Sequence, residues 1–314
     1  MADAGAPPSR EGEASRLIDV HAHFWHRDAG RSDWAALNDA RFRAGDRMGI
    51  AVHVASVLGS YGFTSPTYFP SPRDVALGND AMLALCDAEP ERVRMYVTVN
   101  PNHTAHALAE VERCAARGAI GIKLLASRRA DDPLLDPIAD LAAERGLPIL
   151  HHAWQHRRHD WPSQEASDGL DLARLAARHP AATIILAHIG GGGDWAHTHA
   201  AIADVPNVVV DLSGSGVDRG MLDATLGAIG PERMLWACDV TMETGLAKLR
   251  ALEVIGLEPE RLELVKWGNA MRIFPDGAFP EFAGSATEPA PRNPRQGPAA
   301  HTPQSVTARR RNSA

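Results

Sequence analysis

The chain has 314 residues, of which 45% are hydrophobic and 23% charged, with a formal net charge of −7 and a pI of about 6.1. These values are typical of a globular protein, and the lack of a basic excess argues against a nucleic-acid partner. No apolar run reaches the roughly 18 residues that span a bilayer. The cysteines, Cys86, Cys114 and Cys238, show no paired metal spacing and no disulfide framework, which predicts a reducing, cytoplasmic setting.

The two ends of the chain differ in composition from the middle. Residues 1–15 are small and polar without an apolar core, so we expect a disordered leader and not a secretory signal. Residues 284–314 are rich in Pro, Ala, Arg, Ser and Thr and almost lack large apolar side chains, which predicts a disordered tail. The segment 16–275 between them is close to the ~250 residues of a (β/α)8 barrel.

Short apolar runs of strand type recur through this segment and alternate with stretches of helical period, such as Ala105–Arg117. Such alternation predicts a parallel sheet with helical crossovers. Eight units predict an α/β TIM barrel in a single domain, with an open doubly wound sheet as the alternative. The eight runs are Leu17–Val20, Ala51–Val57, Val93–Val99, Ala119–Leu124, Leu147–His152, Ala182–His188, Asn207–Leu212 and Met234–Asp239.

Polar side chains stand near the ends of five of these runs, where a barrel carries its catalytic groups. The first pair lies two positions apart on one strand, so both imidazoles point to the same face. Imidazoles and a carboxylate that converge on one rim predict a site for a divalent metal. In chain order the side chains are His21, His23, Lys123, His151, His152, His188 and Asp239.

The sequence resembles the amidohydrolase superfamily of metal-dependent (β/α)8 enzymes, and within it the amidohydrolase-related (amidohydrolase 2) branch. The matching stretches occur in the family's order and cover roughly residues 16–275, although they do not identify a substrate. They are Ile18–His23, Gly121–Leu124, Pro148–His152, Ile185–Gly191, Trp236–Asp239 and Gly268–Phe274.

Carried over by position, the resemblance implies that His21, His23, His152 and Asp239 hold a divalent metal, with zinc the expected ion. Such a metal lowers the pKa of its bound water to near neutrality and so creates a nucleophile. The resemblance implies that Asp239 takes the water proton and delivers it to the leaving group. It implies that His188 faces the water or the substrate oxygen, either as a hydrogen-bond donor or as a ligand of a second metal.

Two positions leave a choice open. Adjacent strand residues face opposite ways, so only one of His151 and His152 can join the site. The family spacing favours His152 and leaves His151 packed between barrel and helices. Lys123, which we assign to the catalytic group, has three interpretations: a structural salt bridge, a carboxylated lysine bridging two metals, or a cation that holds a substrate carboxylate or carbonyl.

Further residues near the strand ends are candidates for the pocket wall. Trp25 and Trp154 follow the first and fifth runs, and we expect both to bind substrate. Gly190–Gly193 predicts a flexible rim loop, with phosphate binding as the alternative. Asp211 lies near the end of the seventh run and is expected to support the histidine of the sixth strand or to contact substrate. His53 lies within its strand and is not expected to be a ligand.

The function predicted from these features is that of a metal-dependent hydrolase acting on a small carbonyl compound, namely an amide, a lactone or an ester. The lysine at position 123 favours hydrolysis, because the decarboxylases of this branch do not usually carry one there. The alternative is a metal-dependent non-oxidative decarboxylase or hydratase on the same fold. One ion or two would fit the residues. We also expect a homodimer, because barrels of this size often pair.

Overall fold

A computed structural model of the protein describes residues 16–27, 30–57, 65–154, 163–191, 194–216, 219–240 and 242–282. The predicted leader 1–15 and the predicted tail 284–314 lie outside these residues, so their disorder stays a prediction. Within the described residues, no helix combines the length and the apolar character that crossing a bilayer requires.

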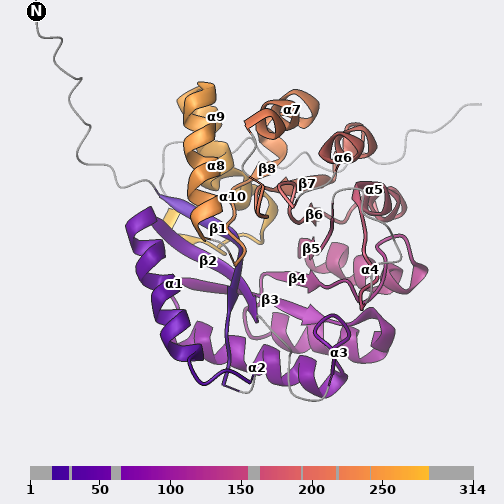
Figure 1. The fold of residues 1–314 in the computed structure, drawn as a ribbon. Helices are drawn as coiled ribbons and strands as arrows, with labels where there is room; N and C mark the ends of the chain where they lie inside the picture. The colour runs from indigo at the N-terminus through magenta and orange to yellow at the C-terminus, as the bar shows by residue number, and fades with distance from the viewer. Residues whose placement is uncertain are drawn as a thin grey trace, which may run out of the picture.

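Eight parallel strands form one sheet in which each strand pairs with the next in the chain, and the helices surround it (Figure 1). A parallel bridge between Ala22 and Asp239 joins the last strand to the first. The predicted TIM barrel is therefore confirmed, because a doubly wound sheet would reverse its strand order. The strands are β1 Leu17–Phe24, β2 Ile50–Val57, β3 Val93–Val99, β4 Gly121–Leu124, β5 Ile149–His151, β6 Ile184–Leu186, β7 Val208–Asp211 and β8 Met234–Leu235.

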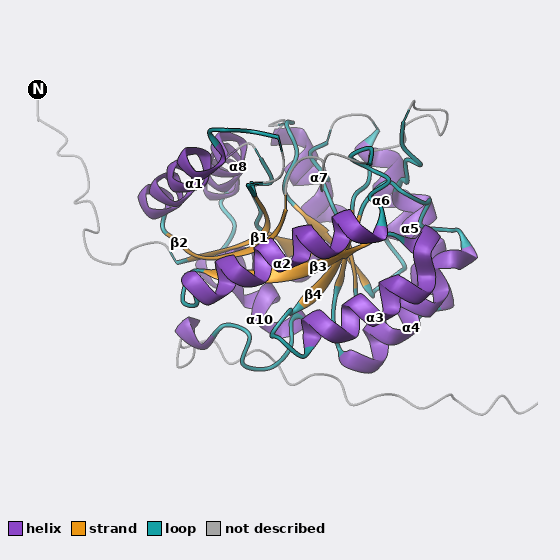
Figure 2. Ribbon diagram, turned by 90° about the horizontal axis from the view of Figure 1, so that it is seen from below, coloured by secondary structure: helices purple, strands orange, loops and turns teal. Residues whose placement is uncertain are grey.

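The helices pack around the outside of the barrel, as the two views in Figures 1 and 2 show. Helices α1 and α4 end at Gly49 and Gly146, whose φ angles of 80° and 65° place them in the left-handed region that glycine enters without steric cost. The helices are α1 Trp34–Met48, α2 Pro72–Ala88, α3 Thr104–Ala115, α4 Asp136–Arg145, α5 Gly169–Arg178, α6 Trp195–Ile202, α7 Arg219–Ile229, α8 Met242–Ile255, α9 Pro259–Glu263 and α10 Asn269–Ile273.

Side chains that alternate along the strands divide the core into two parts. One face of each strand packs against the helices, and the other fills the barrel with residues such as Val20, Val54 and Leu150. A segment that follows β8 closes one end of the barrel: Phe274 is fully buried in the inner cluster and its ring lies 5.9 Å from that of Tyr96. Ile273, the residue before it, is partly buried against the same cluster.

Strands β5, β6 and β8 end earlier than their apolar runs predict. His188 and Asp239 have φ angles of 66° and 60°, which turn the backbone out of the extended conformation. The polar residues therefore follow the strands, and their side chains are aimed by the turn as well as by strand alternation. This geometry positions the site.

Candidate metal centre

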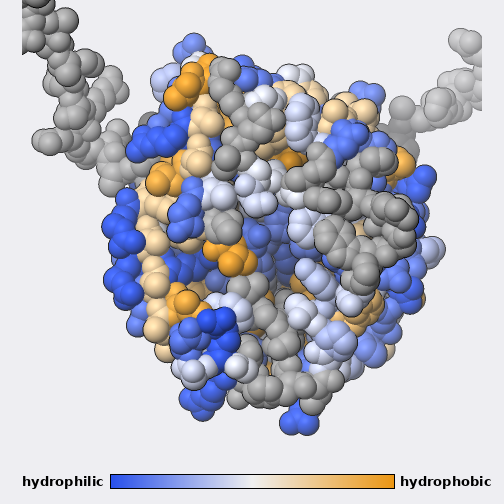
Figure 3. All heavy atoms as spheres, viewed as in Figure 1, coloured by the Kyte–Doolittle hydropathy of each residue, from blue (hydrophilic) through white to orange (hydrophobic). Residues whose placement is uncertain are grey.

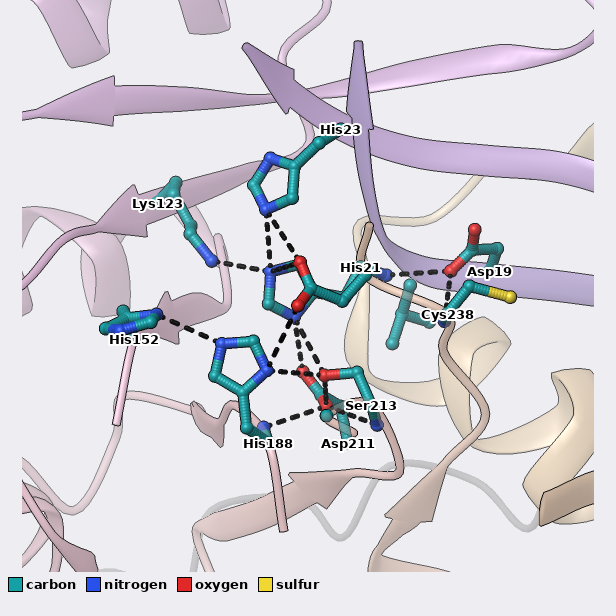
Figure 4. A network of polar contacts seen from close by, with 12 residues as sticks. Asp19, His21, His23, Lys123, His152, His188, Asp211, Ser213 and Cys238 are labelled. Carbon is teal, nitrogen blue, oxygen red and sulfur yellow. Dashed lines mark hydrogen bonds and ion pairs between the residues drawn. The ribbon is translucent and has the colours of Figure 1, made fainter. Parts of the chain in front are cut away.

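His21 and His23 of β1 point into the same space above the barrel, as predicted for residues two positions apart (Figure 4). Their Nε2 atoms lie 3.1 Å from each other. The outer Nδ1 of His21 donates to the carboxylate of Asp211 at 2.8 Å, and Nδ1 of His23 lies 3.2 Å from the Ser56 hydroxyl. Because Asp211 fixes the proton of His21 on Nδ1, the Nε2 lone pair of His21 faces the site.

Asp239 completes a first group of donor atoms with these two histidines. Its Oδ1 lies 3.2 Å from Nε2 of His23 and 3.8 Å from Nε2 of His21, and its Oδ2 lies 3.6 Å from Nδ1 of His188. Burial by itself would raise the pKa of Asp239, but the imidazoles of His188, His23 and His21 hold that pKa well below its usual value. The site therefore contains an ionised carboxylate.

Lys123 of β4 lies inside the same group and is 1% exposed. Its Nζ donates to Nε2 of His21 at 2.7 Å. Burial lowers the pKa of Lys123 to about 8, against the opposing effect of the nearby carboxylates Asp239 and Asp211. No carboxylate of the described residues comes within ion-pair distance of Nζ. Among these residues, therefore, nothing supports the interpretation of Lys123 as one half of a structural salt bridge. A protonated Lys123 and a metal cannot share the lone pair of His21, so metal binding requires this lysine to lose its proton, to be carboxylated or to move.

A chain of hydrogen bonds sets the proton positions on the other side of the site. Ser213 donates to Oδ1 of Asp211 at 2.5 Å, and its oxygen accepts from Nδ1 of His188 at 2.9 Å. Nε2 of His188 then accepts from Nδ1 of His152 at 3.0 Å. This order leaves Nε2 of His152 with a lone pair, and that buried atom has no hydrogen-bond partner. An orphaned, buried imidazole nitrogen on a side chain that contacts His188 fits a metal ligand.

The described residues offer two groups of three donor atoms within 4.8 Å of one another, namely His21, His23 and Asp239, and His21, His188 and Asp211. His152 belongs to neither group in this arrangement, so its role as a ligand stays a prediction. Imidazoles and carboxylates are ligands for zinc and also for manganese, so the donor set fits a divalent metal without selecting between these ions.

His151 lies on the other side of β5. It is fully buried, and its Nδ1 donates to the carbonyl oxygen of His152 at 2.7 Å. Burial, the largest effect, lowers the pKa of His151 to about 4, so it is neutral at pH 7. Ile149, two positions earlier on the same face, packs with the outer cluster against the helices. The expected packing of His151 between barrel and helices is what the structure has.

A cavity of about 300 Å³ opens beside these residues, and Figure 3 shows a hollow with hydrophilic residues near the middle of this face. Trp154, expected in the pocket wall, lines the cavity and its ring stacks at 26° and 6.0 Å from that of His188. Tyr68, which no sequence pattern indicated, lines it as well, 5.5 Å from the ring of His152. The cavity is thus polar at the candidate metal ligands and aromatic at its wall.

Trp25 lies elsewhere. Asn38 of α1 binds both backbone groups of Trp25, each at 2.9 Å, and so ties the segment after β1 to that helix. The Trp25 side chain lines a second cavity of about 470 Å³, together with Trp34. Because this cavity is not the one beside the histidines, the substrate-binding role of Trp25 stays a prediction that the geometry of the site does not support.

The glycine run after β6 is described only in part, since Gly192 and Gly193 lie outside the described residues. The N–H of Gly190 donates to the carbonyl of Ser213 at 3.2 Å, and that of Gly191 donates to the carbonyl of His188 at 2.7 Å. Both amides are therefore used within the chain. The phosphate-cradle alternative would need them free, so these two residues favour the rim loop.

A family model described as amidohydrolase matches residues 18–275, which include every one of the strand-end residues above. The chain belongs to the amidohydrolase family. This confirms the resemblance that the sequence motifs indicated. None of the curated protein sequences matches the chain.

Several solved structures of similar fold are decarboxylases. 2,6-Dihydroxybenzoate decarboxylase from Rhizobium is 16% identical, with a TM-score of 0.63 over 82% of this chain and 98% of that one. 5-Carboxyvanillate decarboxylase from Sphingomonas paucimobilis is 20% identical, with a TM-score of 0.61 over 83% and 99%. A dihydroxybenzoic acid decarboxylase from Polaromonas, with bound manganese and the inhibitor 2-nitroresorcinol, is 18% identical, with a TM-score of 0.62 over 82% and 96%. At identities this low, the similarity of the structures establishes a shared fold and no more.

Proposed function

We propose that the protein is a metal-dependent, non-oxidative decarboxylase that acts on a small aromatic or otherwise unsaturated carboxylic acid. The observation that carries the proposal is Lys123, a buried cation that lines the cavity with no carboxylate partner among the described residues. The sequence motifs counted this lysine in favour of hydrolysis, but its unpaired charge in the cavity favours an acid as substrate. A carboxylate of the substrate would supply that partner. The decarboxylases of similar fold support the same reaction class.

The residues of the site divide the work of such a reaction. Lys123, once it has moved off Nε2 of His21 to let the ion bind there, holds the substrate carboxylate. The faces of Trp154 and Tyr68 bind a planar apolar ring beside it. His21, His23 and Asp239, with His152, would hold the divalent ion, which when bound supplies Lewis-acid polarisation of substrate oxygens. Manganese, the ion named in the Polaromonas decarboxylase, and zinc are the two ions to test first.

The proton balance of decarboxylation assigns a role to Asp239. When the bond to the carboxyl carbon breaks, its electron pair stays on the ring carbon, carbon dioxide leaves and the ring carbon takes up one proton. Asp239 lines the cavity, and its Oδ2 lies 3.6 Å from Nδ1 of His188, so its carboxylate can take up a proton from solvent and deliver it to the carbon.

A metal-dependent hydrolase acting on an amide, lactone or ester is the second candidate. It is favoured by the 2.7 Å contact between Nζ of Lys123 and Nε2 of His21, since a carboxylated lysine here would add a carboxylate ligand to the group of His21, His23 and Asp239. In that reaction Asp239 would accept a proton from water.

A substrate panel on protein loaded with manganese or zinc separates the two candidates. Hydroxybenzoic acids should release carbon dioxide in equal amount to the decarboxylated arene, and chelator treatment should abolish the release. Acid release from lactones, esters or amides without carbon dioxide from any carboxylic acid would replace the proposal with the hydrolase. The cytoplasmic setting and the homodimer remain predictions.

A further inference from the structure

Asp239 has a backbone conformation that needs support from outside its own strand. Its φ angle of 60° lies in the left-handed region, which is uncommon for residues other than glycine and is maintained only where neighbouring contacts enforce it. Its N–H donates to the carbonyl of His21 at 2.7 Å, which ties it to β1. Its own carbonyl has turned away from the sheet and requires a different donor.

That donor is Arg41 of helix α1. One terminal nitrogen of its guanidinium, Nη1, donates to the carbonyl oxygen of Asp239 at 2.7 Å. The other, Nη2, donates to Oδ2 of Asp19 at 2.8 Å. Arg41 is 8% exposed and Asp19 is fully buried, so the pair is shielded from water. A planar guanidinium can make both directed bonds at once, which a single ammonium group cannot do.

Asp19 connects this pair to the ends of both strands. Its Oδ1 accepts from the backbone N–H of His21 at 3.3 Å and from that of Cys238 at 2.9 Å. Figure 4 shows these two bonds meeting at one carboxylate oxygen of Asp19. His53 of β2 also donates to Oδ2 of Asp19, at 3.1 Å. Arg41 and Asp19 therefore reach the backbone on both sides of the point where the barrel closes.

We propose that Arg41 is a positioning residue for the metal centre. By holding the carbonyl of Asp239, it fixes the left-handed turn that aims the Asp239 carboxylate at His21 and His23. By binding Asp19, it locks that turn to the β1 segment that carries the two histidines. The inference rests on the predicted role of Asp239 as a metal ligand and is independent of the choice between decarboxylase and hydrolase.

The substitution Arg41→Lys tests the inference with little loss of fold. The ammonium keeps the positive charge beside buried Asp19 but gives up the simultaneous bond to the carbonyl of Asp239. Arg43→Gln is the matched control, since Arg43 lies on the exposed side of the same helix. We expect Arg41→Lys to bind Co²⁺ about 10-fold more weakly, the lower end of the effect of removing a group that orients a metal ligand. We also expect it to alter the visible absorption spectrum of bound Co²⁺.

Asp239→Asn, measured in the same way, distinguishes the two ways in which the inference can fail. If Asp239→Asn changes the Co²⁺ spectrum while Arg41→Lys binds and absorbs as the unmodified protein does, Arg41 does not position the ligand. If Asp239→Asn leaves the spectrum unchanged, Asp239 is not a ligand and the proposed site is wrong. Far-ultraviolet circular dichroism checks the fold, and Arg41→Gln, which keeps one amide donor without charge, serves as second variant if Arg41→Lys does not fold.

Discussion

The carboxylate of Asp211 accepts a hydrogen bond from Nδ1 of His21 at 2.8 Å, although 190 residues separate the two in the chain. Both side chains are fully buried. Burial by itself would raise the pKa of Asp211. His21, His188 and Ser213 together lower it by more, so the pKa of Asp211 lies below its usual value. An ionised Asp211 fixes the tautomer in which His21 offers its Nε2 to a metal.

Asp211→Asn should therefore weaken metal binding by ~10–100-fold, the usual effect of losing the partner that orients a ligating histidine. The Asn side chain can donate a hydrogen bond as well as accept one, so it no longer fixes the proton of His21 on Nδ1. Competition with a chromophoric chelator measures the dissociation constant. Asp204→Asn, at an exposed position after α6, is the control. Equal affinities in the two variants would remove Asp211 from the metal site.

The adjacent histidines of β5 should respond differently to substitution. His152→Ala should lower the bound metal because it removes the orphaned Nε2 beside His188. His151→Ala should keep the metal and instead destabilise the fold, since it leaves a cavity between barrel and helices. Metal analysis and thermal unfolding of both variants check this. Loss of metal in His151→Ala with normal content in His152→Ala would reverse the assignment.

The barrel could be predicted from the sequence, because the spacing of apolar residues indicates the strands. The grouping of the residues that follow the strands could be predicted as well, because the ends of parallel strands meet at one rim of the barrel. His21 and His23 face one another for this reason. The support around them could not be predicted. Ser213 and Tyr68 reach the site through loops, and Arg41 reaches it from a helix that is far along the chain from Asp239. Such contacts depend on how helices and loops pack, which no local pattern encodes.

Trp25 illustrates the same limit. Its position two residues after His23 placed it near the rim, but the two bonds from Asn38 draw its backbone towards α1. The left-handed φ angles of His188 and Asp239 were equally invisible, because neither residue is the glycine that usually indicates such a turn.

Lys248 of α8 should make the stability of the protein depend on pH. It is 1% exposed, its Nζ donates to the carbonyl of Gly214 at 2.5 Å, and burial lowers its pKa to about 8. In the unfolded chain the pKa is about 10.5, so between these values the unfolded state binds more protons. The free energy of unfolding should therefore rise between pH 8 and 10.5, by on the order of 3 kcal/mol from this group.

Urea unfolding at several pH values measures this rise. Lys248→Met should make the rise smaller by about half, because buried Lys123, whose pKa is also lowered to about 8, contributes the rest. Lys266→Met, which replaces a lysine that is only partly buried, should retain the full rise. A Lys248→Met protein whose stability rises with pH as steeply as that of the unmodified protein would show that Lys248 does not carry the effect.

Asp239→Asn should separate proton transfer from binding. We expect kcat to fall by at least ~10²-fold, the usual contribution of a positioned proton-transfer group. The histidines remain, so metal should still be bound at saturating concentration, and KM should change less than kcat. Steady-state kinetics with metal analysis of the same samples checks both statements. Full activity with full metal content would exclude Asp239 from the reaction.

The most direct measurement of the proposed decarboxylase is the reaction of manganese-loaded protein with a hydroxybenzoic acid in deuterium oxide. The account predicts one molecule of carbon dioxide per molecule of arene, and one deuterium on the ring carbon that carried the carboxyl group. Proton and deuterium NMR of the product measure the label, and Asp239→Asn should form this product at least ~10²-fold more slowly. Recovery of every carboxylic acid intact, with lactones or amides hydrolysed by the same sample, would contradict the account.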